Sequence, residues 1–147
     1  MKKNTVMGLL IIALIILVIS GCGSAPPPAS DPVTTTQQPE GGSLILEGAA
    51  YHTVVRGDTL ADIAAVRYGG SNMYFFPLIR LANKSEVPDP DVIEVGQRLV
   101  VPDLQRNLNN NGAKALLKND MLSVARQYEK QGKPAATSRL RNLADKI

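Results

Sequence analysis

The stretch His52–Gly69, HTVVRGDTLADIAAVRYG, combines a strand signal and a helix signal around one sharp corner. Its first part, Thr53–Val55, is a β-branched run, and such residues favour strands. The corner follows at a glycine, and Asp58 and Thr59 are both residue types that cap helix N-termini. Apolar side chains then recur at helical spacing until Gly69, which is a typical helix stop. The stretch therefore predicts a strand, a corner and a helix of about two and a half turns.

The residues after this helix predict a second helix, a loop and a second strand. Helical spacing of apolar side chains indicates a helix over Tyr74–Leu81, in which Pro77 is tolerated only near the first turn. Prolines and acids mark residues 84–97 as a loop, and the run Arg98–Pro102 indicates a strand closed by a proline. The predicted order is therefore strand, helix, helix, strand.

Three motifs in this region together resemble the LysM domain. They are the corner VVRGDTL at residues 54–60, Asn83 at the end of the second helix, and the ending IEVGQRLVVP at residues 93–102. The resemblance covers residues 51–102 and implies an α+β fold, a βααβ domain with a two-stranded antiparallel sheet. It departs at His52, where the family usually has an aromatic residue, and this leaves the register of the first strand open. The resemblance also implies a non-catalytic module that binds glycans containing N-acetylglucosamine, such as peptidoglycan.

The resemblance places a shallow glycan groove between the corner and the loop before the second strand. Antiparallel strands bring the end of the first and the start of the second to one sheet edge, so the two loops should face each other. The candidate glycan-binding residues are Gly57, Asp58, Thr59, Leu60, Pro90, Asp91, Val92 and Ile93. We expect accessible peptide groups to bind the acetamido group, Leu60 and Ile93 to line its methyl site, and Asp91 to be an exposed rim residue. Alternatively, Asp58 and Thr59 only cap the helix, and the two aliphatic residues only belong to the core.

The sequence gives little support for catalysis or for a metal site. Hydrolysis of a wall polymer needs a positioned carboxylate pair, a Cys–His pair or a metal, and the chain has one histidine and one cysteine. His52 is expected to be a half-exposed strand residue, not a base or ligand. The acids Asp89, Asp91 and Glu94 do not have the spacing of a calcium loop. We therefore expect no enzymatic activity, no metal and no cofactor.

The N-terminal residues resemble a bacterial lipoprotein signal. Two lysines precede the uncharged apolar run Val6–Ile19. As a helix this run would span about 21 Å, short of the roughly 30 Å hydrocarbon core. The motif Ile19–Cys22 then has an aliphatic residue, two small residues and the cysteine, which implies that residues 1–21 are a signal peptide and that Cys22 is lipidated. Two or three acyl chains would anchor the chain stably in a membrane, and Gly23 favours the periplasmic face of an outer membrane, where the organism has one.

Residues 22–50 have the composition of a disordered linker. Proline, serine, threonine, glutamine and glycine replace nearly every residue that could pack. A flexible chain of this length would span about 30 Å root-mean-square. The segment Ser43–Gly48, SLILEG, interrupts the bias and is either a short strand or a strap across the next domain.

The C-terminal residues 103–147 predict a helical hairpin with a positive charge. They carry nine basic and four acidic residues, which favours an anionic surface. Two apolar stripes at helical spacing flank a turn at Gly132–Pro134. The stripes are Leu117, Met121, Val124 and Tyr128, followed by Ala136, Leu140, Leu143 and Ile147. The hairpin either stabilises itself or the LysM domain, or it docks a protein partner.

Together these features predict a lipid-anchored, non-catalytic protein of the cell envelope that binds peptidoglycan and positions a membrane at the cell wall. One alternative is an interaction scaffold, in which the C-terminal helices recruit a wall enzyme or division component. A less favoured alternative is a sensor of a small ligand or ion, because parts of the motif are similar to a LysM variety associated with potassium. Nucleic acid is a poor partner for an exported, anchored chain.

Overall fold

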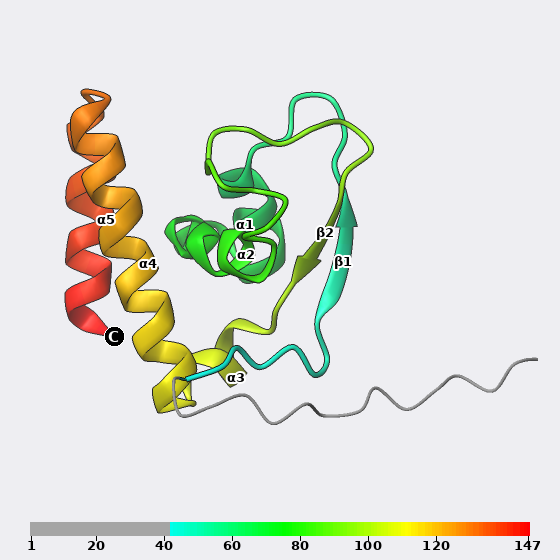
Figure 1. Cartoon of the computed structure of the whole chain (residues 1–147), viewed down its shortest axis with the longest axis horizontal. Coiled ribbons are helices and arrows are strands. Elements are labelled where there is room, and N and C mark those ends of the chain that lie inside the picture. Colours follow the sequence, from blue (N-terminus) through cyan, green and yellow to red (C-terminus); the bar gives the residue numbers. More distant parts are fainter. Residues whose placement is uncertain (1–41) are drawn as a thin grey trace, which may run out of the picture. The chain divides into compact units, whose positions relative to one another are not determined.

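The computed structural model describes residues 42–147 (Figure 1). Its elements are β1 (Ala50–Thr53), α1 (Leu60–Tyr68), the 3₁₀ helix η1 (Gly70–Phe75), α2 (Phe76–Ala82), β2 (Arg98–Val101), α3 (Leu104–Leu108), α4 (Asn111–Lys130) and α5 (Pro134–Lys146). The predicted signal peptide, Cys22 and most of the predicted linker lie outside the described residues. Among residues 42–147, no helix is both long and apolar enough to cross a membrane.

The two strands form the predicted antiparallel sheet, and the α+β class is confirmed. Ala50 lies opposite Val101 and Thr53 opposite Arg98. The first strand is nevertheless earlier than the predicted run Thr53–Val55, because the chain leaves the sheet at the corner. The backbone N–H of Val55 donates to the Asp58 carboxylate at 2.9 Å, so this donor serves the corner and not the sheet.

We call residues 51–102, which resemble a LysM domain, the LysM region. In it, polar side chains mark the start of α1 and the end of α2. The Thr59 hydroxyl accepts a hydrogen bond from the backbone N–H of Asp62 at 3.1 Å, which makes Thr59 the N-cap of α1. The second predicted helix is divided, because η1 precedes α2 and Pro77 occupies the first turn of α2. Asn83 ends α2, as the motif predicts, and its side chain also bonds both backbone groups of Val100 on β2 at 2.8 Å.

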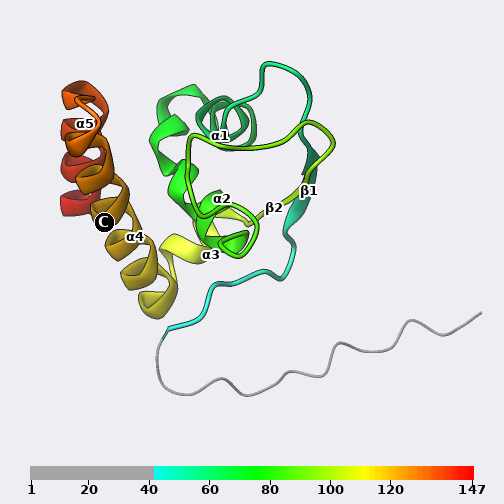
Figure 2. The same ribbon diagram turned by 45° about the horizontal axis from the view of Figure 1, so that its top comes forward.

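The C-terminal region forms the predicted hairpin, in which α4 and α5 pack side by side (Figures 1 and 2). Leu117 and Leu140 are completely buried, while Leu143 is only partly buried. The turn between the helices uses Gly132 at φ 69°, a conformation that glycine adopts without strain. The short helix α3 was not predicted from the sequence.

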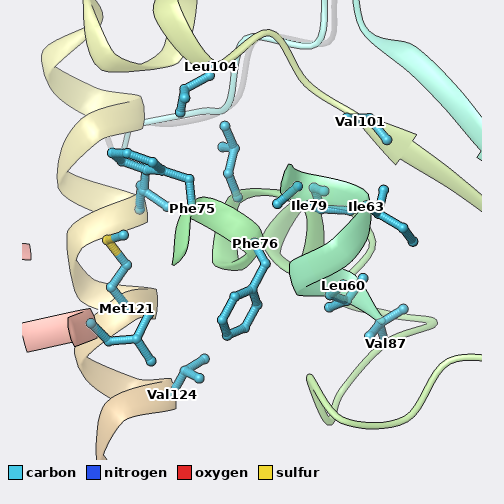
Figure 3. Close-up of a cluster of buried hydrophobic side chains, with 14 of the residues drawn as sticks. Leu60, Ile63, Phe75, Phe76, Ile79, Val87, Val101, Leu104, Met121 and Val124 are labelled. Atoms are coloured by element: carbon cyan, nitrogen blue, oxygen red, sulfur yellow. The ribbon is translucent and has the colours of Figure 1, made fainter. Parts of the chain in front are cut away.

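The hairpin packs on the LysM region, a point that the sequence left open. Phe75 and Phe76 belong to the same buried cluster as Met121 and Val124 of α4 (Figure 3). Burial of apolar surface is the main favourable contribution to folding. Residues of the βααβ unit and of the hairpin therefore share one hydrophobic core.

The segment Ser43–Gly48 is a strap and not a strand. The side chain of Asn107 in α3 accepts a hydrogen bond from the backbone N–H of Ile45 and donates one to the backbone carbonyl of Ile45, both at 2.9 Å. Asn107 is completely buried, so these bonds satisfy an amide that would be costly to bury alone. The strap ties the start of the described chain to the helices after β2.

Candidate functional site

The two loops that the sequence places opposite each other line one hollow of about 220 Å³. Its lining residues are Asp58, Thr59, Leu60 and Ala61 from the corner and α1, Phe76 from α2, Pro90, Asp91 and Ile93 from the second loop, and Tyr128 from α4. Two candidates from the sequence, Gly57 and Val92, do not line it. Val92 is 59% exposed and borders a separate surface hollow beside Glu94 and Val95.

Asp58 organises the corner and does not cap α1. Its carboxylate accepts the backbone N–H of Val55 and lies 2.7 Å from Nε2 of His52 on β1. The hydrogen bond from Val55, followed by the contact with His52, holds the pKa of Asp58 below its usual value. Because Thr59 caps the helix, both polar side chains of the corner are already engaged within the loop.

The apolar candidates differ in how far they are buried. Leu60 is 2% exposed, so it is a core residue that only borders the hollow. Ile93 is partly buried and packs against the core from the opposite loop. Ala61, in the first turn of α1, and Phe76, in α2, complete the apolar lining. The small lining side chain of Ala61 leaves room beside the corner.

Asp91 is exposed and lines the hollow, as expected, but its carboxylate is engaged by the hairpin. Its Oδ1 accepts a hydrogen bond from the Tyr128 hydroxyl at 2.8 Å, and its Oδ2 accepts one from Nζ of Lys133 at 2.6 Å. Both carboxylate oxygens are therefore held by the hairpin. We call this cluster of Asp91, Tyr128 and Lys133 the Asp91 clamp.

Tyr128 is the lining residue that comes from outside the LysM region. The ring centroids of Tyr128 and Phe76 are 6.2 Å apart, and Nζ of Lys133 lies 4.5 Å from the centroid of the Tyr128 ring. The residue is 7% exposed, and burial, followed by the hydrogen bond to Asp91, raises the pKa of its hydroxyl. The hydroxyl is thus the donor in the hydrogen bond to Asp91.

No group of three or more histidine, cysteine, aspartate or glutamate side chains that could hold a metal ion occurs within residues 42–147. The residues that line the hollow supply hydrogen-bonding groups and apolar surface. The eight candidate glycan-binding residues stay predictions. Ala61, Phe76 and Tyr128 were missed by sequence reasoning, because apolar periodicity marks them only as helix or core residues.

Comparison with known proteins identifies the class of this region. Residues 52–102 match the model of the LysM domain. A LysM domain is thus present, and it implies binding to glycans of the peptidoglycan or chitin type.

Two curated relatives, both from Mycobacterium tuberculosis, are "Esterase MT1326" of strain CDC 1551 and "Esterase Rv1288" of strain H37Rv. Each is 41% identical over 66 residues, which cover 45% of this chain and 14% of the relative. The chain thus spans a small part of these relatives, and the match covers its LysM region. No solved structure matches the chain significantly.

Proposed function

We propose that this protein is a non-catalytic binding protein for peptidoglycan, anchored to a membrane of the cell envelope. The observation that carries the glycan-binding part is the LysM domain at residues 52–102, whose two loops line one hollow. The hollow combines the apolar side chains of Ala61, Phe76 and Ile93 with polar residues of the corner and the second loop. This combination suits an N-acetyl group, which needs a partner for its amide and an apolar contact for its methyl group.

The names of the two relatives raise a second function, ester hydrolysis. The matched stretch is 14% of each relative. Most of the chain of each named esterase therefore lies outside the similarity. Within the described part of this chain, the one histidine, His52, contacts a carboxylate and not a serine or cysteine. We infer that the shared stretch is a binding module in both kinds of protein.

The scaffold alternative gains little from the hairpin. The apolar side chains of α4 are used within the chain, because Met121 and Val124 pack against Phe75 and Phe76. A docking surface for a partner would need exposed apolar area on these helices. Peptidoglycan binding is therefore the function that these contacts support better.

Ala61→Arg should abolish or strongly weaken glycan binding. Ala61 lines the hollow from the first turn of α1. An arginine at this position would fill the hollow, and because arginine is a good helix former, α1 should be retained. We expect affinity for a soluble N-acetylglucosamine oligomer to fall at least about tenfold, which corresponds to 1.4 kcal/mol. Isothermal titration calorimetry would measure the affinity, and a melting curve would show that the variant is folded.

Val66→Arg is the matched control for this experiment. Val66 lies on the same helix, is 83% exposed and does not line the hollow. We expect its affinity to equal that of the parent within about twofold, as for most surface changes. Equal affinity in the folded Ala61→Arg variant would place glycan binding elsewhere, and no affinity in the parent would reject the proposed function.

Membrane anchoring is proposed through Cys22, which lies outside the described residues. The support is the motif Ile19–Cys22 after a short apolar run. Because only the thiol can form the thioether to diacylglycerol, Cys22→Ser should give an uncleaved precursor without lipid. Labelled fatty acid should enter the parent and not this variant, and normal labelling of Cys22→Ser would reject the anchor.

A further inference from the structure

The second loop of the groove is attached to the hairpin at two points. At Pro88 the attachment runs through Arg80 of α2, which donates from Nη2 to the Pro88 carbonyl at 2.8 Å, while its Nη1 pairs with Asp120 of α4 at 2.5 Å. At Asp91 the attachment is direct, because Tyr128 and Lys133 hold the carboxylate. The part of the loop from Pro88 to Asp91 is therefore coupled to α4 and to the turn that follows it.

The hairpin also supplies part of the lining of the hollow. Tyr128 lines the same hollow as Leu60 and Ile93, and its ring packs at a tilt against Phe76. Its hydroxyl is committed to Asp91, and Nζ of Lys133 lies 4.5 Å from the ring centroid, so Tyr128 offers the hollow the remaining part of its ring surface. Such a surface can contact an acetyl methyl group or the apolar face of a sugar ring.

We propose that the C-terminal hairpin is a functional part of the glycan site. Tyr128 forms one wall against an N-acetylated sugar unit, and the Asp91 clamp positions the second loop at the distance from the corner that this unit requires. Asp91 is then a positioning residue and not the direct ligand of a sugar hydroxyl. This inference rests on the proposed function, and it extends the site beyond residues 52–102.

The test uses the full chain in detergent micelles and a soluble N-acetylglucosamine oligomer. Tyr128→Phe removes the hydroxyl that bonds Asp91 and keeps the ring against Phe76. Lys133→Ala removes the other donor. Because each change frees one oxygen of the Asp91 carboxylate, we expect each to weaken binding by about tenfold in isothermal titration calorimetry, with a folded protein in the melting curve.

Two further variants separate positioning from general stability. Lys133→Arg keeps a cationic donor for Asp91 and should retain most of the affinity. Arg141→Ala breaks the exposed pair between Arg141 and Glu129, 2.6 Å apart on the same hairpin, and should change affinity by no more than about twofold, because exposed pairs contribute little. Equal losses in Arg141→Ala and Tyr128→Phe would overturn the positioning role.

Amide hydrogen exchange of residues 89–93 makes the outcomes distinguishable. Exchange should be faster in Tyr128→Phe than in the parent, because the loop loses one attachment. If the parent binds the oligomer, and Tyr128→Phe and Lys133→Ala bind it with the affinity of the parent, the inference is overturned while the proposed function stands. If the parent does not bind, the proposed function fails, and unchanged exchange in Tyr128→Phe would then also reject the clamp.

Discussion

Replacement of Asp120 by alanine is expected to lower the free energy of unfolding by about 3 to 5 kcal/mol, the usual cost of breaking a buried ion pair from one side. The side chains of Arg80 and Asp120 are 10% and 5% exposed, with Nη1 and Oδ1 2.5 Å apart. Without the carboxylate, the Arg80 guanidinium stays buried between α2 and α4, and within residues 42–147 the Pro88 carbonyl is its one remaining acceptor. Urea unfolding of parent and variant would measure the difference.

Asp145→Ala is the matched control, because Asp145 is an exposed acid on α5 with no ion pair among the described residues. It should change the free energy of unfolding by no more than about 0.5 kcal/mol, as most surface substitutions do. If Asp120→Ala were as stable as Asp145→Ala, the hairpin would not depend on this pair for its attachment to α2. A single unfolding transition in the parent would show that the LysM region and the hairpin unfold together.

The parts of the fold that were predictable are those with local signals. The corner and α1 follow from a capping residue, Thr59, and from apolar spacing, so the helix is where the sequence predicts it. The hairpin follows from two apolar stripes separated by Gly132 and Pro134. The first strand was displaced because its end depends on a side chain, Asp58, that competes for the N–H of Val55.

The attachment of the hairpin could not be predicted from local patterns. An apolar stripe shows which face of a helix is buried, but not against which partner. The ion pair joins Arg80 and Asp120, 40 positions apart, and the clamp joins Asp91 and Tyr128, 37 positions apart. A charged residue such as Asp120 is expected at the surface unless its partner is known.

The candidate groove was predictable to the extent that it lies between two motif loops. Asp58, Thr59 and Ile93 line the hollow as expected. Asp91 was placed in the correct loop, but its engagement depends on Lys133, which the sequence places in an ordinary turn. Because Tyr128 of the hairpin belongs to the lining, the two motif loops alone could not predict the whole hollow.

Leu140→Asp should be the most destabilising of the substitutions considered. Leu140 is 0% exposed and lies on α5 within the shared core. Loss of the leucine side chain alone costs about 2 to 5 kcal/mol, and the buried, unpaired carboxylate adds to this cost. We therefore expect a loss above about 4 kcal/mol, which is a large part of the 5 to 15 kcal/mol stability of a typical domain.

The consequence of Leu140→Asp should extend to the proposed glycan site. If α5 no longer packs on α4, then Tyr128 and Lys133 lose their fixed positions, and the second loop loses the Asp91 clamp. We expect reduced helical circular dichroism, a lower melting temperature and weaker binding to the N-acetylglucosamine oligomer. Ser138→Asp, at an exposed position on the same helix, should leave all three unchanged. A Leu140→Asp variant with the melting curve of the parent would contradict the hairpin core and, with it, the route by which the C-terminal helices support the groove.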